Sequence, residues 1–443
     1  MPEIITPAKM PGERKAEETT IALIEDLFSG PGGRRFDVRL WNGRVLKATQ
    51  GDGADLTLTL THPGALRAML LPPGELTLGE AYLGGDFDVE GGMATLLAQV
   101  EHLRNLTLGQ WLSILRRTWT LPKSRPPRRY QEGRRRMQLS GQEHSRERDR
   151  QAVTYHYDTG NGFYALFLGR WMAYSCAYFE TAETDLDAAQ AAKFEHICRK
   201  LRLKPGERLL DIGCGWGGLV VYAAERFGVE ATGINLSQPQ IDYARDWIRE
   251  AGLEGQARIE LLDYRDIDPD QPYDKIVSVG MVEHVGRDKL DEYFQAAYRA
   301  LRPGGLFLNH AIGTHLRRPD TWFERTFLQR GKFMQSYVFP DGELVWISDM
   351  LRAAERCHFE VRDVESLREH YALTLRCWIA NLERHHEAAV ALKDERTYRT
   401  WRLYMSASAY GFDSGGINVY QALLSKTEAG RAELPLTRDD VYR

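Results

Sequence analysis

The sequence predicts an α/β protein with a doubly wound, mostly parallel sheet, preceded by a smaller N-terminal α+β domain. From about residue 188 onward, short apolar segments typical of buried strands alternate with longer segments of helical periodicity. One strand runs directly into a glycine-rich turn that opens a helix, as at the ligand-binding edge of an open parallel sheet. The expected elements are, in chain order, a helix over 188–201, a strand over 207–212, a helix over 218–227, a strand over 230–234, a helix over 239–251, strands over 257–262 and 273–279, a helix over 290–301 and a strand over 305–312.

The first hundred residues have a different pattern. Leucine and threonine alternate through 56–61, which predicts a half-buried strand, and Asn42-Gly43 predicts a hairpin turn. The chain is long enough for roughly two or three domains. The expected division is a mobile N-terminus over 1–20, an α+β domain over 21–115, a basic linker over 116–150, the α/β domain over 151–430 and a C-terminal tail over 431–443.

Composition and charge exclude several classes of protein. The net charge of −4 argues against nucleic acid as a partner of the whole molecule. The scattered cysteines have no metal-binding spacing, so we expect no metal site and a reducing, cytoplasmic location. No apolar stretch is long enough to span a bilayer, so a lipid substrate would be approached from the membrane surface. The cysteines are Cys176, Cys198, Cys214, Cys357 and Cys377.

Residues 116–150 are crowded with arginine and interrupted by proline. One interpretation is a solvated linker. The other is a patch for anionic lipid headgroups, with Trp111 and Trp119 at the membrane interface. Nucleic acid is a weaker third interpretation, because no known nucleic-acid-binding module accompanies the charge.

The most informative local motif lies in 209–218, where an apolar strand ends in a glycine-rich turn. Glycines permit unusual backbone angles and let a ligand lie against the backbone. The spacing Asp-x-Gly-x-Gly-x-Gly differs from the nicotinamide fingerprint and resembles motif I of the class I methyltransferases. The resemblance implies that fold, with S-adenosylmethionine as the co-substrate. The residues implied to bind it are Asp211, Gly213, Cys214, Gly215 and Gly217.

Two later segments offer further contacts to this co-substrate. Asn235 ends the second strand, where related proteins often carry an acid, and its amide can hydrogen-bond a ribose hydroxyl. Leu236 and Gln240 are neighbouring candidates. After the third strand, Asp263 would accept a hydrogen bond from the adenine amino group. Tyr264 would pack on the adenine ring, although it could also be an ordinary, partly buried aromatic residue.

Five ordered segments carry a narrower resemblance; they are 153–164, 174–179, 279–286, 309–313 and 371–378. Over about residues 150–425 the chain resembles the cyclopropane fatty acid synthase family. Its N-terminal extension fits the bacterial, phospholipid-acting branch better than the shorter mycolic-acid enzymes. The resemblance implies that Tyr174 and Ser175 also contact S-adenosylmethionine.

The resemblance also implies a reaction. A double bond in an acyl chain attacks the methyl group of S-adenosylmethionine, and a base then removes a proton so that the ring closes. In that family the inferred base is a bound bicarbonate. His310, Tyr371 and the backbone N–H groups near Ile312 would donate to its oxygens, and Glu283 would accept its O–H. The residues implied to hold the anion are Cys176, Glu283, His310, Ile312 and Tyr371.

Taken singly, each of these five residues would more often have a structural role, and only their order and flanking residues indicate function. Covalent catalysis by Cys176 is not expected, because its segment contains no histidine or lysine partner. Aromatic rings would attract the cation and exclude water from the chamber. The rings implied to line it are Tyr155, Tyr157, Phe163, Tyr174, Tyr178 and Phe179.

Residues 315–340 are expected to form a cover over the acyl chain, with an ordinary core helix as the alternative. Its apolar residues are Trp322, Phe323, Phe327, Phe333, Met334, Tyr337 and Phe339, and its arginines are Arg317, Arg318, Arg325 and Arg330.

The expected function is cyclopropane formation on an unsaturated acyl chain of a membrane phospholipid. The resemblance implies a homodimer, and we expect it to be bound peripherally to the anionic inner face of the membrane, with no nucleic-acid partner. Two alternatives remain open. One is a fatty acyl methyltransferase that leaves a methyl or methylene branch, and the other is a non-catalytic lipid-binding adaptor on a methyltransferase fold.

Overall fold

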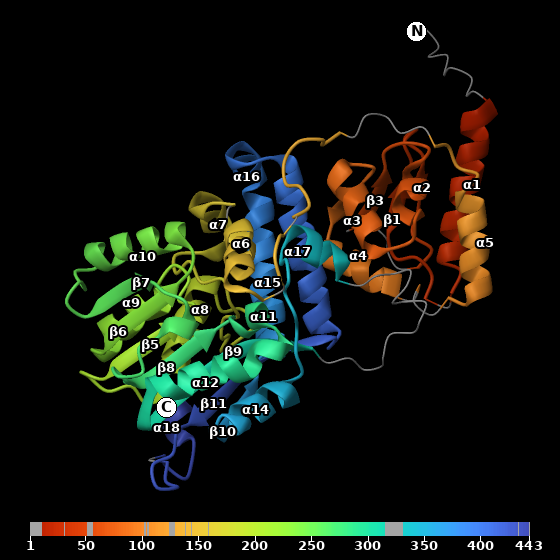
Figure 1. The fold of residues 1–443 in the computed structure, drawn as a ribbon. Coiled ribbons are helices and arrows are strands. Elements are labelled where there is room, and N and C mark those ends of the chain that lie inside the picture. Colours follow the sequence, from red (N-terminus) through yellow and green to blue (C-terminus); the bar gives the residue numbers. More distant parts are fainter. Residues whose placement is uncertain are drawn as a thin grey trace. The chain divides into compact units, whose positions relative to one another are not determined.

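The computed structural model describes residues 11–30, 32–50, 56–101, 103, 106–123, 129–137, 139–142, 144–157, 159–314, 331–432 and 434–442. The chain folds as two compact units, each described by itself below (Figure 1). The N-terminal unit comprises 1–135, 319–337 and 394–410. The second unit comprises 136–318, 338–393 and 411–443 and is called the catalytic unit, because it holds the residues that the sequence resemblance implies to be catalytic. Residues 394–410 thus cluster with the N-terminal unit, although the sequence analysis places them inside the 151–430 domain.

A four-stranded sheet with the order β2-β1-β3-β4 forms the centre of the N-terminal unit. The predicted hairpin is confirmed, because β1 and β2 pair in antiparallel fashion around Asn42-Gly43. Side chains of β3 alternate between buried and half-buried, as the Leu-Thr pattern predicts. The strands are β1 (Asp37–Arg39), β2 (Val45–Leu46), β3 (Leu56–Leu60) and β4 (Phe87–Gly91). The helices are α1 (Pro11–Leu27), α2 (Ala65–Leu70), α3 (Glu75–Gly84), α4 (Met93–Val100), α5 (Leu108–Thr118), α13 (Lys332–Tyr337) and residues 395–410 of α17 (Glu395–Asp413).

The N-terminal segment differs from its prediction. Residues 11–20, expected to be mobile, form the first part of helix α1, while 1–10 lie outside the described residues. The side chains of Ala16, Thr20, Leu23 and Leu27 are buried, and their spacing of three to four residues places them on one helical face. The polar composition of the opposite face hid this apolar stripe.

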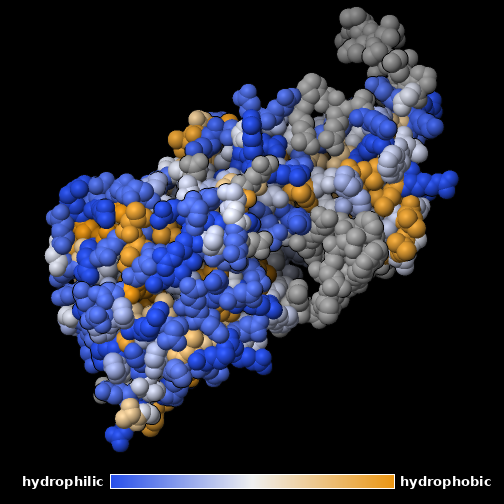
Figure 2. All heavy atoms as spheres, in the orientation of Figure 1, coloured by the Kyte–Doolittle hydropathy of each residue, from blue (hydrophilic) through white to orange (hydrophobic). Residues whose placement is uncertain are grey.

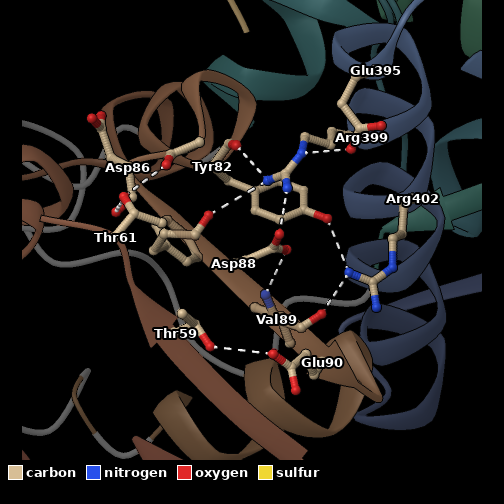
Figure 3. A network of polar contacts seen from close by, with 12 residues as sticks. Thr59, Thr61, Tyr82, Asp86, Asp88, Val89, Glu90, Glu395, Arg399 and Arg402 are labelled. Carbon is tan, nitrogen blue, oxygen red and sulfur yellow. Dashed lines mark hydrogen bonds and ion pairs between the residues drawn. The ribbon is translucent and has the colours of Figure 1, made fainter. Parts of the chain in front are cut away.

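Two arginines of α17 complete a buried polar cluster with the edge strand β4 (Figure 3). Arg399 donates to the carbonyl oxygen of Tyr82 at 2.9 Å, to Asp88 at 2.6 Å and to Glu395 at 3.0 Å. Arg402 donates to the Tyr82 hydroxyl and to the carbonyl oxygens of Val89 and Gly91, all within 3.0 Å. Strand β4 therefore has carbonyl groups bonded to side chains where no neighbouring strand pairs with it.

The catalytic unit confirms the predicted fold class. Its seven-stranded sheet has the order β10-β11-β9-β8-β5-β6-β7, with β9, β8, β5, β6 and β7 parallel and β11 antiparallel to both neighbours. The strands are β5 (Arg208–Ile212), β6 (Glu230–Asn235), β7 (Ala257–Leu261), β8 (Tyr273–Val279), β9 (Leu301–Thr314), β10 (Glu360–Ser366) and β11 (Ile417–Ser425). The strand order reverses between β5 and β8, which is where open α/β sheets bind ligands at the carboxyl ends of their strands.

Helices cover both faces of this sheet (Figure 1). One apolar cluster contains Phe194, Val220 and Ile241 from α8, α9 and α10, and a second contains Phe294 and Met350 from α12 and α14. The helices of this unit are α6 (Arg146–Tyr157), α7 (Asn161–Leu168), α8 (Leu186–Leu201), α9 (Gly218–Phe227), α10 (Gln238–Glu250), α11 (Val282–Val285), α12 (Leu290–Ala300), α14 (Ile347–Arg356), α15 (Arg368–Arg384), α16 (His386–Leu392) and α18 (Asp439–Tyr442).

The predicted cover is only partly described, since 315–330 lie outside the described residues. Within α13, the rings of Phe333 and Tyr337 are buried and stack on each other with centroids 5.2 Å apart, in the N-terminal unit. Phe339 belongs to the catalytic unit, where it stacks on His156 at 4.1 Å. The role of this segment as an acyl-chain cover stays a prediction. Among the residues that the structure describes, no helix is both long and apolar enough to cross a membrane.

Candidate cofactor and catalytic site

A large cavity lies at the carboxyl ends of β5, β6 and β8 in the catalytic unit. It encloses about 1170 Å³ of atom-free space, part of which is open to solvent. Every residue predicted to bind S-adenosylmethionine lines it except Gly217. The lining members of the predicted set are Tyr174, Ser175, Asp211, Gly213, Cys214, Gly215, Asn235, Leu236, Gln240, Asp263 and Tyr264.

The glycine-rich turn forms one wall of this cavity. Gly213, Gly215 and Gly217 have φ values of 80°, 55° and 84°, a left-handed conformation that favours glycine. A Cβ at Gly213 would lie 2.5 Å from the Met281 side chain, and one at Gly217 would lie 2.9 Å from the Ala244 side chain. Gly217 thus serves the packing of helix α9 against α10, which explains why it does not line the cavity.

Asn235 organises the loop that follows β6. Its Nδ2 donates to the carbonyl oxygen of Gly215 at 3.1 Å and to Oε1 of Gln240 at 2.9 Å, and its Oδ1 accepts from the N–H groups of Leu236 and Ser237. An asparagine amide has two donors and two acceptor positions, so these bonds use its capacity. Within the described part of the chain, Nε2 of the buried Gln240 has no partner. Gln240 therefore offers a donor to a ligand that Asn235 does not.

The side chain of Asp263 is held by a neighbour that the sequence analysis missed. Arg265 donates to both carboxylate oxygens of Asp263, at 2.8 and 2.7 Å, and to Asp149 at 3.0 Å. Burial alone would raise the pKa of Asp263, but the hydrogen bonds from Arg265 lower it. The buried ring of Tyr264 packs edge-on against Tyr293, with centroids 5.5 Å apart.

Lys193 of helix α8 is a second residue that the sequence analysis missed. It is buried, lines the cavity and donates to Oγ of Ser175 at 2.9 Å. Burial lowers the pKa of Lys193 to about 7 and raises that of Asp211 to about 7. The attraction between the two opposite charges partly offsets the effect of burial on both pKa values. In the described structure, Oδ1 of Asp211 has no partner. The helical spacing of Lys193 with Ala189 and Ile197 was the available signal, because it places a lysine on the buried face of the helix.

Glu283, on helix α11, contacts strand β9, which carries both His310 and Ile312. The Ile312 N–H donates to Oε1 of Glu283 at 2.6 Å, so this N–H is used within the protein and is not free for an anion, contrary to the prediction. His310 lies two residues before Ile312 on β9, and its carbonyl oxygen accepts from the Gly280 N–H at 2.8 Å. Two buried atoms, Oε2 of Glu283 and Nε2 of His310, have no partner among the described residues. Burial raises the pKa of Glu283 to about 7 and lowers that of His310 to about 3, so the imidazole is neutral at neutral pH.

Cys176 and Tyr371 connect to the same strands through Leu367. The Cys176 thiol lies 3.7 Å from the Leu367 carbonyl oxygen, which also accepts from the Tyr371 N–H at 3.1 Å. The Leu367 N–H donates to Val419, which pairs with Ile312 across β11 and β9. Burial raises the pKa of the Cys176 thiol, which argues against a nucleophilic thiolate.

The five residues predicted to hold the anion do not line the large cavity.

The predicted aromatic set divides into two groups. Tyr157 and Tyr174 line the cavity, and Tyr174 stacks on Trp378 with ring centroids 5.3 Å apart. Tyr178 instead stacks between His196 and His370, at 4.5 and 4.8 Å. The remaining members, Tyr155, Phe163, Tyr178 and Phe179, do not line the cavity.

Comparisons with known proteins agree with this geometry. A sequence profile described as mycolic acid cyclopropane synthetase matches residues 144–422, and a domain of unknown function matches 23–109. The chain is 39% identical to a "Probable fatty acid methyltransferase" of Pseudomonas putida, over 92% of this chain and 96% of that protein. It is also 39% identical to the cyclopropane-fatty-acyl-phospholipid synthase of Escherichia coli K12, over 61% of this chain and 66% of the relative.

A solved structure is similar as well. The mycolic acid cyclopropane synthase CmaA1 complexed with SAH and CTAB superposes with a TM-score of 0.59 at 34% identity, covering 62% of this chain and 97% of CmaA1. The matched residues include the glycine-rich turn, the cavity and the Glu283–His310 region. The chain therefore belongs to the mycolic acid cyclopropane synthetase family of S-adenosylmethionine-dependent methyltransferases.

Proposed function

We propose that the protein transfers a methylene unit from S-adenosylmethionine to the double bond of an unsaturated acyl chain in a phospholipid, forming a cyclopropane. The bond between the sulfonium sulfur and its methyl carbon breaks and releases S-adenosylhomocysteine. Both alkene carbons form a bond to the transferred carbon, and a base takes one proton from it. The observation that carries the proposal is the buried pair Glu283 and His310, each with a polar atom that finds no partner in the described structure. Native proteins satisfy nearly all buried polar groups, so two such atoms on residues linked through Ile312 support a ligand at this place.

The cavity fits the proposed co-substrate. Oδ1 of Asp211 can accept from an ammonium group, and Nε2 of Gln240 can donate to a hydroxyl group; both are buried and lack a partner among the described residues. S-adenosylmethionine has both groups, and it supplies an electrophilic methyl group on its sulfonium. The residues implied to hold it are those that line the cavity.

We infer that Glu283 and His310 hold a small oxyanion such as bicarbonate, because one side chain can accept and the other can donate. His310 would donate from Nε2, Glu283 would accept an O–H at Oε2, and Cys176 and Tyr371 would complete the site. Ile312 contributes by fixing Glu283 through its N–H. A bound bicarbonate would supply a base held at a set distance from the proton that it removes.

A second candidate function is a fatty acyl methyltransferase that leaves a methyl or methylene branch. It is favoured by the printed name of the Pseudomonas putida relative, which aligns over both units. The non-catalytic adaptor has less support, because the unpaired buried atoms of Asp211 and Glu283 would cost stability without a ligand.

The test is to incubate the purified chain with S-adenosylmethionine carrying a ¹³C methyl group and with vesicles of a mono-unsaturated phospholipid. Proton and carbon NMR of the extracted lipid should show the high-field signals of a cyclopropane CH₂ that carries the label. Labelled methyl or vinylidene signals instead would support the second candidate. Unchanged lipid, with no S-adenosylmethionine binding by calorimetry, would support the adaptor.

We further propose that helix α5 docks the N-terminal unit on an anionic bilayer. Leu108, Leu112 and Trp119 are 63%, 59% and 61% exposed, and their spacing places them on one helical face. The exposed Arg116 lies beside them, which suits anionic headgroups. In Figure 2, hydrophobic residues are visible at the surface of the region that carries α1 and α5. Trp111, expected at the interface, is instead buried, because the opposite face of α5 packs inward.

The basic segment itself supports the proposal less than expected, because several of its arginines are already paired. Arg117 bonds Asp26, Arg146 bonds Asp266 and Arg148 bonds Asp341. Binding to phosphatidylglycerol vesicles, measured by flotation, should fall about tenfold in Leu112→Glu. Leu392→Glu, at a 51% exposed position of α16, is the matched control and should bind normally. Equal binding by both variants would refute α5 as the docking face.

A further inference from the structure

We propose that Gln421, held by Lys200, fixes His310 in the neutral tautomer that carries its proton on Nε2, and so makes His310 a hydrogen-bond donor toward the bound anion. Gln421 and Lys200 are then positioning residues that act through His310. The functional part of this inference rests on the proposed function, because that function assigns an anion to Nε2. The tautomer itself follows from the contacts below.

The three side chains form a continuous hydrogen-bonded chain across three elements of the catalytic unit. Nζ of Lys200, on α8, lies 3.0 Å from Oε1 of Gln421, on β11. Nε2 of Gln421 lies 3.2 Å from Nδ1 of His310, on β9. Gln421 and His310 are directly opposed in the β9–β11 register, and these strands are neighbours in the sheet (Figure 1). All three side chains are at most 2% exposed, so water does not compete for these bonds.

The donor and acceptor capacity of each group sets the direction of the chain. A lysine ammonium only donates, so the glutamine atom that faces Lys200 has to be the oxygen. The amide nitrogen of Gln421 then faces His310, and an amide nitrogen only donates. Nδ1 of His310 therefore accepts. In a neutral imidazole the other nitrogen, Nε2, carries the proton.

Charged groups near Lys200 and His310 keep Lys200 an ammonium and His310 neutral. Glu365 accepts from Lys200 at 2.5 Å and from His196 at 2.7 Å, and Asp363 lies 3.7 Å from Lys200. Burial alone would raise the pKa of Glu365, but these partners lower it to about 2, so a carboxylate anchors the ammonium. Burial and the positive charges of Lys193 and Lys200 lower the pKa of His310, so the imidazole stays neutral.

The consequence concerns Nε2, the other nitrogen of the His310 ring. Nε2 of His310 is buried, and no residue that the structure describes accepts its proton. An imidazolium would bind an anion more strongly than a neutral Nε2–H does, but its charge would make that anion a weaker base. The neutral donor therefore holds the anion and leaves it able to accept a proton. The hydrogen bonds from Lys200 through Gln421 to His310 thus make Nε2 of His310 a donor, without placing a full charge in the site.

The tautomer can be read directly by NMR. The protein is labelled with ¹³C,¹⁵N-histidine. The signals that disappear in His310→Gln are assigned to His310. The wild type should show the shifts of an Nε2–H tautomer, whereas an Nδ1–H tautomer would overturn the proposal. Gln421→Met should shift the signals toward a tautomer mixture. It should also slow ring formation about tenfold while S-adenosylmethionine affinity, measured by calorimetry, changes less than about twofold.

A matched control separates this effect from damage to the strand. Asn418, also on β11, bonds Ser366 and Tyr420 rather than His310, so Asn418→Met should keep the wild-type tautomer and rate. An unchanged tautomer in Gln421→Met, or equal rate losses in both variants, would contradict the role proposed for Gln421. A wild type with the Nε2–H signal but no cyclopropane product would contradict the proposed function and leave the tautomer assignment standing.

Discussion

Two buried polar clusters of this molecule differ in how completely their hydrogen bonds are formed. In the N-terminal unit, Arg399 and Arg402 bond carbonyl oxygens and carboxylates within 3.0 Å (Figure 3). In the catalytic unit, Glu283 and His310 each leave one buried atom without a partner among the described residues. The first cluster is complete by itself and stabilises the fold. We propose that a ligand completes the second, whose unpartnered atoms lower the stability of the protein without it.

The largest effect is expected at the incomplete cluster. In Glu283→Gln, Oε1 can still accept from Ile312, but the group at Oε2 becomes a donor and repels the O–H of the anion. Ring formation should slow by about 10²–10⁴-fold, since the anion that Glu283 orients would act as the base, and a positioned base contributes that much. S-adenosylmethionine affinity, measured by calorimetry, should stay within about threefold. An equal loss of affinity would show that Glu283 serves the cofactor and not the anion.

A substitution in the complete cluster of Arg399 and Arg402 should instead lower the stability of the fold. Arg399→Met removes the side-chain donor of the Asp88 carboxylate and of the Tyr82 carbonyl oxygen, which keep only their bonds from the backbone N–H groups of Val89 and Gly85. Because the Asp88 side chain is 37% exposed and can be hydrated, the loss should be about 1–3 kcal/mol, which hydrogen exchange of β3 and β4 amides can measure. Arg14→Met is the control, because the Arg14–Glu18 pair is exposed and should contribute less than about 1 kcal/mol. Similar losses in both variants would refute the stabilising role of the buried cluster.

The pH dependence of stability should also reveal the raised pKa of Glu283. Its pKa is raised to about 7 by burial, so its contribution to stability is full below the unfolded pKa and is lost as pH rises through the folded pKa. Between about pH 4.5 and pH 7, the free energy of unfolding of the wild type should therefore fall relative to that of Glu283→Gln. The difference should reach roughly 3 kcal/mol by denaturant titration. Parallel curves for the two proteins would mean that Glu283 is ionised throughout.

A smaller effect is expected for Lys193, which supports the cavity through Ser175 and through its charge. In Lys193→Met, the pKa of Asp211 should rise further, because the ammonium no longer lowers it. S-adenosylmethionine should bind about tenfold more weakly at neutral pH and recover part of its affinity at higher pH. Calorimetry across pH measures this, with the exposed Lys289→Met as control. A pH-independent loss would assign Lys193 a packing role only.

The fold and the cofactor cavity were predictable because their signals are local. The strand ending at Asp211, the glycine spacing and the alternation of strands and helices lie within short stretches of sequence. The hairpin at Asn42-Gly43 was predictable for the same reason. Helix α1 was missed because its charged face masked the spacing of Ala16, Thr20, Leu23 and Leu27.

The proposed anion site could be named only by resemblance, since its residues come from distant elements. Cys176 reaches Ile312 through Leu367 and β11, a path that no sequence spacing indicates. Lys193 and Gln421 were missed because single polar residues on apolar faces have no motif. The donation from Ile312 to Glu283 depends on the register of β8 and β9, which periodicity does not determine. The role of 394–410 in the N-terminal unit likewise depends on tertiary packing.

A crystal structure with S-adenosylhomocysteine and bicarbonate would decide most directly whether the incomplete cluster is a ligand site. A planar anion should lie within hydrogen-bond distance of Oε2 of Glu283 and Nε2 of His310, with S-adenosylhomocysteine in the cavity beside Asp211. An anion found elsewhere, or those two atoms bonded to each other or to the protein while S-adenosylhomocysteine is bound, would contradict it.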